Sequence, residues 1–405
     1  MGCDVSKDSG GGHNRKKNEP FLLQEIRDHK GGINCMVLSD DSSLLVTGSD
    51  DRTVRMWSTL SDPTECLGVL EGHDGYITCC AVHEQCVITG SSDSTIRKWF
   101  IATAECIAIY TGHTARISRL LCVGQLIFST SSDHSVRAWL FDLREISDDQ
   151  GEACIKVFEG HTKGTYPILH VPMDENAGLD LGAGVLVSGS ADCTARSWSV
   201  DSGLCLKIFR GHTAPLNCLE YDDMKQVLYT AGGDAIIKSW NLMTGEALRT
   251  FSGHEGPIFS LLVHKRMMYS GSSDKSARSW VLEFGECTRI YRGHRHTVSS
   301  IRHFEGMIYT GCGDAVARMF EAKSGTLKRA FKGHENAIVC VEVVPEKVFT
   351  GSYDGSLRVW TTSGVKDETV FGTDYDDRNS KDDDMEEDSE DVQKAVKSLD
   401  PYLTY

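Results

Sequence analysis

Short apolar runs alternate with turn residues over residues 21–365, and the pattern repeats about every forty residues. In the second unit, residues 77–82 and 86–91 are apolar runs, a turn follows at Asp93, and two further runs cover 95–99 and 106–110. Four short β-rich runs separated by turn residues predict an antiparallel meander. The pattern therefore predicts an all-β fold made of repeated four-stranded sheets.

Four residue types recur at fixed spacing in all eight units. Each unit has a His, then a Ser or Thr four residues before an Asp, and an aromatic residue six residues after that Asp. The eight sets are His29, Thr47, Asp51, Trp57; His73, Thr89, Asp93, Trp99; His113, Ser129, Asp133, Trp139; His161, Ser188, Asp192, Trp198; His212, Thr230, Asp234, Trp240; His254, Ser270, Asp274, Trp280; His294, Thr310, Asp314, Phe320; and His334, Thr350, Asp354, Trp360.

A single four-stranded sheet cannot bury both of its faces, so consecutive sheets must pack on one another, and a closed ring removes the exposed ends. We expect residues 21–26 to close the ring, because they precede His29 as residues 248–251 precede His254. They would supply the outer strand of the unit that ends at Trp360. A competing run, 368–371, has the usual spacing after Trp360, but it is flanked by acids.

With these motifs, residues 21–365 resemble a WD-repeat β-propeller; Gly72 before His73 and Lys98 before Trp99 are typical of that family. The resemblance implies eight blades, each with a His–Ser/Thr–Asp–Trp hydrogen-bond chain. The indole N–H donates to the hydroxyl, the hydroxyl donates to the imidazole, and the Asp orients the ring. We therefore expect these His and Asp residues to be structural, with no metal site among them.

The seventh unit departs from the pattern because Phe320 has no N–H group. Thr310 then loses its donor. We expect this unit to be the weakest, by about 0.5–1.5 kcal/mol for one net hydrogen bond.

The His and the Asp of each unit should lie at the same end of the sheet, here called the top, because one precedes the innermost strand and the other follows its antiparallel neighbour. Non-repeated side chains beside them are candidates for binding proteins or peptides, with loop packing as the competing interpretation. Aromatic and Arg residues are frequent anchors of protein interfaces. The candidates are Asn34, Tyr76, Arg116, Tyr166, Asn217, Phe259, His296 and Tyr353.

Two insertions, around residues 142–152 and 171–184, interrupt the regular spacing. They predict enlarged bottom loops on blades 3 and 4, side by side in one sector. Two hypotheses stay open for them: tolerated surface insertions, or a docking ridge.

Two other recurrences predict structural roles. The cations two residues before each aromatic position should form salt bridges between blades; they are Arg55, Arg97, Arg137, Arg196, Lys238, Arg278, Arg318 and Arg358. The cysteines seven residues before a repeated His should be small buried groups of the outer strands; they are Cys66, Cys106, Cys154, Cys205 and Cys287.

Composition limits the function classes. A net charge of -16 and a pI near 5.4 argue against nucleic-acid binding, which needs a basic footprint. No run approaches the roughly 18 apolar residues of a membrane span, and the N-terminus lacks the apolar core of a signal peptide. The fifteen cysteines form no C-x-x-C pair, so we expect reduced thiols in the cytoplasm.

The N-terminal residues 1–20 predict a flexible basic leader that carries lipid. Gly2 with Ser6 satisfies the myristoylation pattern, and Cys3 is placed for palmitoylation. One acyl chain binds membranes marginally, whereas a second chain or a basic patch makes binding stable. Because Arg15, Lys16 and Lys17 follow, we expect a peripheral protein on the inner face of a membrane. An unmodified, disordered leader is the alternative.

The C-terminal residues 366–405 contain five basic and fourteen acidic side chains. Eleven of the acids lie within residues 374–391. Such a run predicts a disordered, solvated tail. Residues 389–399 have apolar groups at helical spacing and charges that suit the helix dipole. They predict a short helix, with two interpretations: a transient solvated helix, or a helix that binds a partner.

No catalytic motif is present: the chain lacks G-x-S-x-G, a phosphate loop, H-E-x-x-H and a Cys/His nucleophile signature. The prediction is a non-enzymatic, cofactor-free protein-interaction scaffold with a monomeric propeller. The alternative is substrate recognition for a ubiquitin ligase, as in F-box propellers with eight blades. That family's arginines lie five residues after the His or just before the turn Asp, and in this chain none of those positions is basic.

Overall fold

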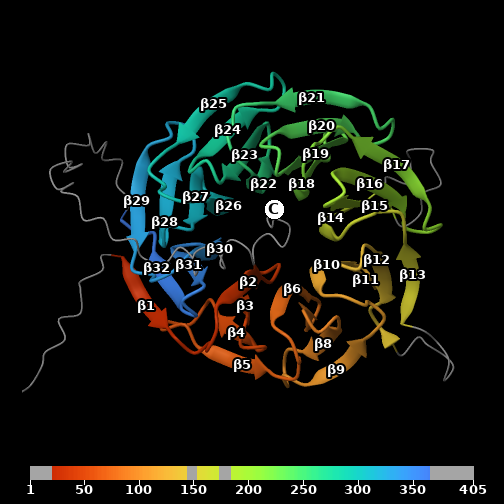
Figure 1. Ribbon diagram of the computed structural model, residues 1–405. Coiled ribbons are helices and arrows are strands. Elements are labelled where there is room, and N and C mark those ends of the chain that lie inside the picture. Colours follow the sequence, from red (N-terminus) through yellow and green to blue (C-terminus); the bar gives the residue numbers. More distant parts are fainter. Residues whose placement is uncertain (1–20, 144–152, 173–183, 365–405) are drawn as a thin grey trace, which may run out of the picture.

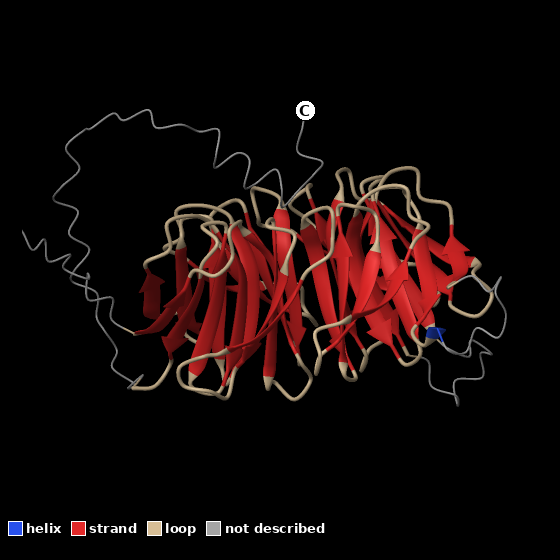
Figure 2. Ribbon diagram, turned by 90° about the horizontal axis from the view of Figure 1, so that it is seen from below, coloured by secondary structure: helices blue, strands red, loops and turns tan. Residues whose placement is uncertain are grey.

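The computed structural model describes residues 21–143, 153–172 and 184–364. Eight four-stranded antiparallel sheets stand around a central axis, so the predicted all-β, eight-bladed propeller is confirmed (Figure 1). Seen from the side, the strands run between the two faces of the ring and the loops form those faces (Figure 2).

Each blade has the same order of strands from the axis outward. The innermost strands are β2 (Ile33–Leu38), β6 (Ile77–His83), β10 (Ile117–Val123), β14 (Thr165–Val171), β18 (Leu216–Asp222), β22 (Ile258–His264), β26 (Val298–Phe304) and β30 (Ile338–Val344). The second strands are β3 (Leu44–Ser49), β7 (Cys86–Ser91), β11 (Leu126–Ser131), β15 (Val185–Ser190), β19 (Val227–Gly232), β23 (Met267–Ser272), β27 (Met307–Cys312) and β31 (Lys347–Ser352). The third strands are β4 (Val54–Ser58), β8 (Ile96–Phe100), β12 (Val136–Leu140), β16 (Thr194–Ser199), β20 (Ile237–Asn241), β24 (Ala277–Val281), β28 (Val316–Glu321) and β32 (Leu357–Thr361). The outer strands are β5 (Cys66–Leu70), β9 (Cys106–Tyr110), β13 (Cys154–Phe158), β17 (Cys205–Arg210), β21 (Ala247–Phe251), β25 (Cys287–Tyr291), β29 (Leu327–Lys332) and β1 (Leu22–Ile26).

The core is a ring of eight apolar clusters, and each cluster spans two neighbouring blades. In one of them, Trp99 of blade 2 packs with Val54 and Met56 of blade 1. The other seven clusters place the same aromatic position against the preceding blade. Burial of an aromatic side chain is a large stabilising term, so the repeated Trp holds adjacent blades together.

Close approach between blades requires small residues on the second strands. A Cβ atom on Gly48 would lie 2.5 Å from the Cγ2 atom of Ile77 in the next blade. That contact is too short for any larger residue, which accounts for the glycine at this position.

The N-terminal strand closes the ring, as predicted. Strand β1 pairs antiparallel with β32, with Leu22 opposite Trp360 and Ile26 opposite Leu357. Glu25 accepts a hydrogen bond from Arg358 at 3.0 Å, and the ring of Phe21 lies 3.9 Å from the guanidinium carbon of Arg329 in blade 7. The competing run, residues 368–371, lies outside the described residues.

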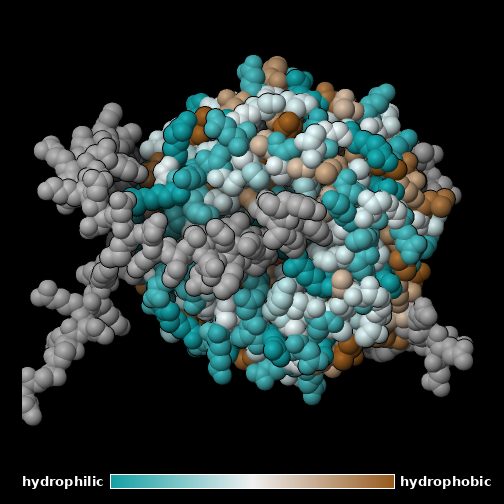
Figure 3. Space-filling view, viewed as in Figure 1, coloured by the Kyte–Doolittle hydropathy of each residue, from teal (hydrophilic) through white to brown (hydrophobic). Residues whose placement is uncertain are grey.

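The outer strands correct one prediction. Four of the five repeated cysteines, Cys66, Cys106, Cys205 and Cys287, are exposed, and Cys154 is half-buried. These cysteines begin the outermost strand of a blade, and in the described part of the chain four of the five face solvent there. Apolar residues also gather on this rim over β9, β13 and β17, where Ile107, Ile155 and Leu206 are exposed (Figure 3).

The repeated cations correct a second prediction in blades 7 and 8, where the ion pairs lie within one blade. Arg358 pairs with Glu25 of the same blade, and Arg318 pairs with Asp314. Arg55 differs, because its Nη1 atom lies 3.6 Å from Asp28 in the connection between β1 of blade 8 and β2 of blade 1. Arg97 instead lies beside Gly72, where a Cβ atom would be 2.6 Å from its Nη1 atom. Gly72 has a φ of 151°, so the Gly that precedes the repeated His serves both the backbone turn and this packing.

Both insertions fall mainly on residues 144–152 and 173–183, outside the described part of the chain, so the two hypotheses for them stay open. The described residues contain no helix long and apolar enough to cross a membrane. All fourteen described cysteines are free thiols.

Deleting residues 1–26 should lower the free energy of unfolding by roughly 3–6 kcal/mol, since it removes the β1 ladder and the burial of Leu22 and Ile26. Chemical denaturation followed by tryptophan fluorescence would measure the change. Deletion of residues 1–20 alone is the matched control and should leave stability unchanged. Equal stability of the two truncated chains would show that β1 does not close the ring.

Candidate interaction site at the mouth of the central channel

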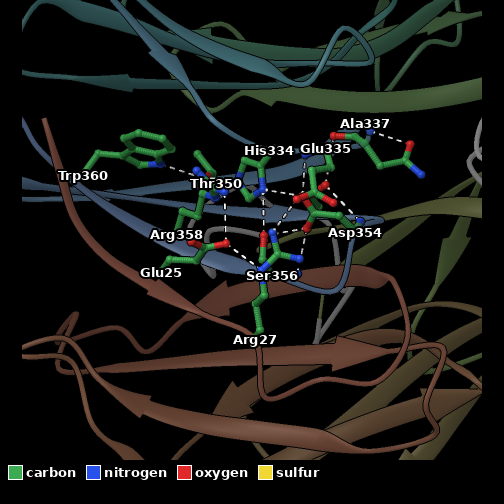
Figure 4. Close-up of polar contacts among 12 residues, drawn as sticks. Glu25, Arg27, His334, Glu335, Ala337, Thr350, Asp354, Ser356, Arg358 and Trp360 are labelled. Carbon is green, nitrogen blue, oxygen red and sulfur yellow. Dashed lines mark hydrogen bonds and ion pairs between the residues drawn. The ribbon is translucent and has the colours of Figure 1, made fainter. Parts of the chain in front are cut away.

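The repeated His, Ser/Thr, Asp and Trp residues form hydrogen-bond chains in seven blades. His Nδ1 lies 2.6–3.1 Å from an Asp oxygen, and His Nε2 lies 2.7–3.0 Å from the hydroxyl. The indole Nε1–H donates to the same hydroxyl at 2.8–2.9 Å. Figure 4 shows this chain in blade 8, from Trp360 through Thr350 and His334 to Asp354.

The Asp residues of these chains are saturated with donors. Asp51, for example, also accepts from the backbone N–H of Lys30 and from the hydroxyl of Thr53. Burial raises the pKa of Asp51, but hydrogen bonds from His29 and Thr53 outweigh it and hold the pKa well below its usual value. These groups therefore anchor the turns. Among the described residues, no group of three or more His, Cys, Asp or Glu side chains is arranged to hold a metal ion.

In the seventh blade, more of the His–Thr–Asp–aromatic hydrogen-bond chain is missing than the sequence predicts. His294 Nε2 lies 2.9 Å from Thr310, but its Nδ1 atom is buried with no partner in the described residues. Asp314 instead accepts hydrogen bonds from Arg318, at 2.7 Å and 3.0 Å. The expected His–Asp contact is therefore wrong for this blade, because a neighbouring guanidinium competes for the carboxylate. Burial, with the nearby Arg318, lowers the pKa of His294 to about 4.

The central channel brings together most of the predicted binding residues. Its volume is about 790 Å³, and seven of the eight candidates line it. They are Asn34, Tyr76, Arg116, Tyr166, Asn217, Phe259 and Tyr353. His296 is not among the lining residues; it lies over Gly313, where a Cβ atom would be 2.3 Å from its Nδ1 atom.

Two of the candidates have a structural contact at the channel. The side-chain amide of Asn34 donates to the carbonyl of Ile77 in the next blade at 2.9 Å, and Asn217 donates to the carbonyl of Ile258 at 3.0 Å. Asn34 also donates to Asp50 at 2.8 Å. These amides connect adjacent inner strands, so they fix the shape of the mouth.

One side of the mouth is cationic. Blade 3 supplies two arginines, and each is held by a tyrosine from a neighbouring blade. Arg116 donates to the hydroxyl of Tyr76 at 3.3 Å, and Arg119 donates to the hydroxyl of Tyr166 at 2.6 Å. The guanidinium of Arg119 also lies 4.7 Å from the centre of the Tyr166 ring. Neither arginine has a carboxylate partner within the described residues, so both positive charges are uncompensated there.

Farther along the inner strands, the charged side chains either form ion pairs or have a shifted pKa. Arg302 binds Glu342 through two contacts of 3.0 Å and 2.6 Å. Glu220 on the inner strand β18 is not among the lining residues, and its burial raises its pKa to about 7. Arg119 and these three residues were not among the binding residues predicted from the sequence. Their signal is a charged side chain that breaks the apolar run of an inner strand, where apolar or small residues are expected.

The fold and the hydrogen-bond chains define the class of protein. The family model for "WD domain, G-beta repeat" matches residues 21–58, 64–99, 104–139, 152–199, 203–241, 245–280 and 325–361. The chain belongs to this family. The matched stretches leave out residues 281–324, which contain most of the divergent seventh blade.

Individual relatives resemble the chain over about half of its length. Human WD repeat-containing protein 86 is 44% identical over 200 residues, which are 49% of this chain and 52% of the relative. Mitochondrial division protein 1 of Mycosarcoma maydis is 26% identical over 195 residues, which are 45% of this chain and 22% of the relative. The chain thus covers about half of the human relative and about a fifth of the fungal one.

Two solved structures share the fold alone. The crystal structure of Saccharomyces cerevisiae Sqt1 superimposes with a TM-score of 0.75 at 15% identity, covering 85% of this chain and 99% of Sqt1. The computationally designed Ika8 protein gives a TM-score of 0.72 at 22% identity, covering 84% of this chain and 99% of the design.

Replacing Arg318 by Met should make stability less sensitive to acid. His294 has a folded pKa of about 4, below its unfolded value, so its stabilising contribution is present above about pH 6.5 and is lost toward pH 4. Between pH 7 and pH 5 the wild type should lose about 2 kcal/mol from this residue. In the variant, Asp314 is free to bind His294 and favour its charged form, so this loss should shrink.

Urea denaturation at the two pH values would measure the difference. Arg278→Met is the matched control, because His254 of that blade already binds Asp274 at 2.6 Å. An equal acid response of wild type and Arg318→Met would contradict the role given to Arg318.

Proposed function

We propose that this protein is a non-enzymatic scaffold that binds a segment of a protein partner at the top mouth of its channel. WD40 propellers are typically interaction scaffolds, and this chain belongs to that family. The observation that carries the proposal is the convergence of non-repeated side chains from seven blades on one hollow.

The chemistry of the mouth suits recognition. Tyr76, Phe259 and Tyr353 place aromatic groups around an opening that has a cationic side formed by Arg116 and Arg119. Aromatic and Arg side chains supply most of the binding energy in typical protein interfaces. The propeller holds them on closed sheets, so little conformational entropy is lost when a partner binds.

We further propose that the propeller acts as a monomer at the cytoplasmic face of a membrane. The support is the sequence of the leader, where Gly2 and Cys3 offer two acylation sites before Arg15, Lys16 and Lys17. The leader lies outside the described residues. Its attachment point, strand β1, is part of blade 8 at the outer edge of the ring.

Replacing Phe259 by Ala should remove most partner binding. A hot-spot aromatic contributes about 2 kcal/mol, which corresponds to roughly thirtyfold weaker affinity. Proximity labelling with a ligase fused to the C-terminus would compare the labelled proteins in cells that express wild type or variant.

Phe284→Ala is the matched control, since Phe284 is 61% exposed and belongs to the bottom loop between β24 and β25 of the same blade. The control should preserve the labelled set. If both variants label the same proteins as the wild type, the mouth is not the binding surface.

Replacing Gly2 by Ala should release the protein to the soluble fraction, because the myristoyl acceptor is lost. Cys3→Ser should leave partial, salt-sensitive membrane binding through one acyl chain and the basic residues. Fractionation after feeding cells a clickable myristate analogue would measure both effects. Absence of label on the wild type, with the same solubility as Gly2→Ala, would leave only a soluble scaffold.

A further inference from the structure

A second hollow adjoins the cationic side of the channel mouth. It has a volume of about 530 Å³ and lies between blades 2, 3 and 4. Its polar lining comes from Tyr76, Ser92, Arg116, Ser132, His134 and Lys163. None of its lining residues is acidic. The chain as a whole has a net charge of -16, so the charge of this hollow is opposite in sign to that of the protein.

The cations of this hollow have no anionic partner. In the described part of the chain, Arg116 makes side-chain contacts only with Ser132, at 3.2 Å, and with Tyr76, at 3.3 Å. Lys163 is exposed, and its ammonium group has no hydrogen bond or ion pair there. Like charges held together without a counterion favour an anion in the hollow.

The charge and the number of acceptor oxygens favour a phosphoryl group over a carboxylate. The Nε atom of Arg116 donates to Ser132, and its Nη1 atom donates to Tyr76. Both pairs of parallel N–H groups of Arg116 are therefore partly used, which disfavours a two-bond contact with any anion. An anion that binds several donors through single hydrogen bonds is favoured instead. A phosphoryl group offers three oxygens and nearly two charges, so it can take single bonds from Arg116, Lys163 and the Ser132 hydroxyl at once.

The position of the hollow favours a partner over this chain's own acidic tail. Strand β32 runs from the turn at Asp354 on the top face toward the bottom face, so the chain leaves blade 8 at the face opposite the hollow. We propose that this hollow, defined by Arg116, His134, Lys163, Ser92 and Ser132, binds a phosphorylated serine or threonine side chain of a protein partner. The inference rests on the proposed function and names the chemistry that the mouth recognises.

The test uses the full-length chain immobilised on beads and three pools of short degenerate peptides, with phosphoserine, serine or glutamate at the central position. The wild type should retain the phosphoserine pool at least roughly tenfold better than either other pool, as expected for charge-assisted contacts. Arg116→Gln and Lys163→Gln should each lower this retention to the level of the serine pool. Lys163→Gln also guards against misfolding, because this exposed side chain makes no described contact.

Lys275→Gln is the matched control. Lys275 follows Asp274 as His134 follows Asp133, both have a positive φ (66° and 75°), and Lys275 does not line the hollow. It should bind like the wild type. Equal retention of the phosphoserine and serine pools would overturn the proposal, as would equal retention of phosphoserine and glutamate, which would indicate a site for simple negative charge.

Two further results separate this inference from the proposed function. If the phosphoserine pool binds only after deletion of residues 366–405, the hollow belongs to the chain's own tail and the proposal is wrong. If no pool is retained, but partner labelling in cells still depends on Phe259, the mouth binds proteins and only the phosphoryl site is rejected.

Discussion

Each blade of this propeller depends on its two neighbours to cover its faces. The apolar clusters lie between blades and not within them, with Trp99 packed on blade 1 as one of eight such contacts. A sheet with one uncovered face would expose a full strip of apolar side chains, so the array must close on itself. The ring is closed by β1, the first strand in the sequence, which pairs with β32 in blade 8. A hydrogen bond from Arg358 to Glu25 stabilises this pairing.

The hydrogen-bond chains depend on a local competition for one carboxylate. In seven blades the Asp orients the His, and the cation two residues before the aromatic position leaves that Asp to the imidazole. In blade 7, Arg318 takes Asp314 and leaves the Nδ1 atom of His294 unpartnered. The aromatic position of the same blade is Phe320, so both ends of the hydrogen-bond chain are altered together. The stretches matched by the family model leave out residues 281–324, which include this position. The remaining contact between His294 and Thr310, with the apolar packing of Phe320, still holds the blade in the ring.

The features that could be predicted from the sequence are those that recur in every repeat. Blade number, strand order and ring closure follow from spacings that are visible in eight copies. Seven of eight proposed binding residues line the channel because each lies beside a repeated His or Asp at the top of its blade. The failures concern contacts that only three dimensions define. Cys66 was expected to be buried, but it is exposed on the outermost strand of its blade. Arg318 was expected to bridge blades, but it pairs with Asp314 of its own blade. Arg119 was missed because its unusual place, a charge inside an inner strand, matters only once eight such strands face one channel.

The distribution of charge in the channel makes one sector of the ring different from the others. Repetition makes the blades nearly equivalent, so recognition must come from the few positions that differ. Glu342 neutralises Arg302 on one side of the axis, whereas Arg116 and Arg119 on blade 3 are held by tyrosine hydroxyls, which orient a guanidinium without cancelling its charge. In an acidic protein, two oriented and uncompensated cations beside a hollow attract anionic groups to one sector of the mouth. A nearly symmetrical ring thereby acquires one sector whose charge differs from the rest, and that sector would set the orientation of the segment that we propose it binds.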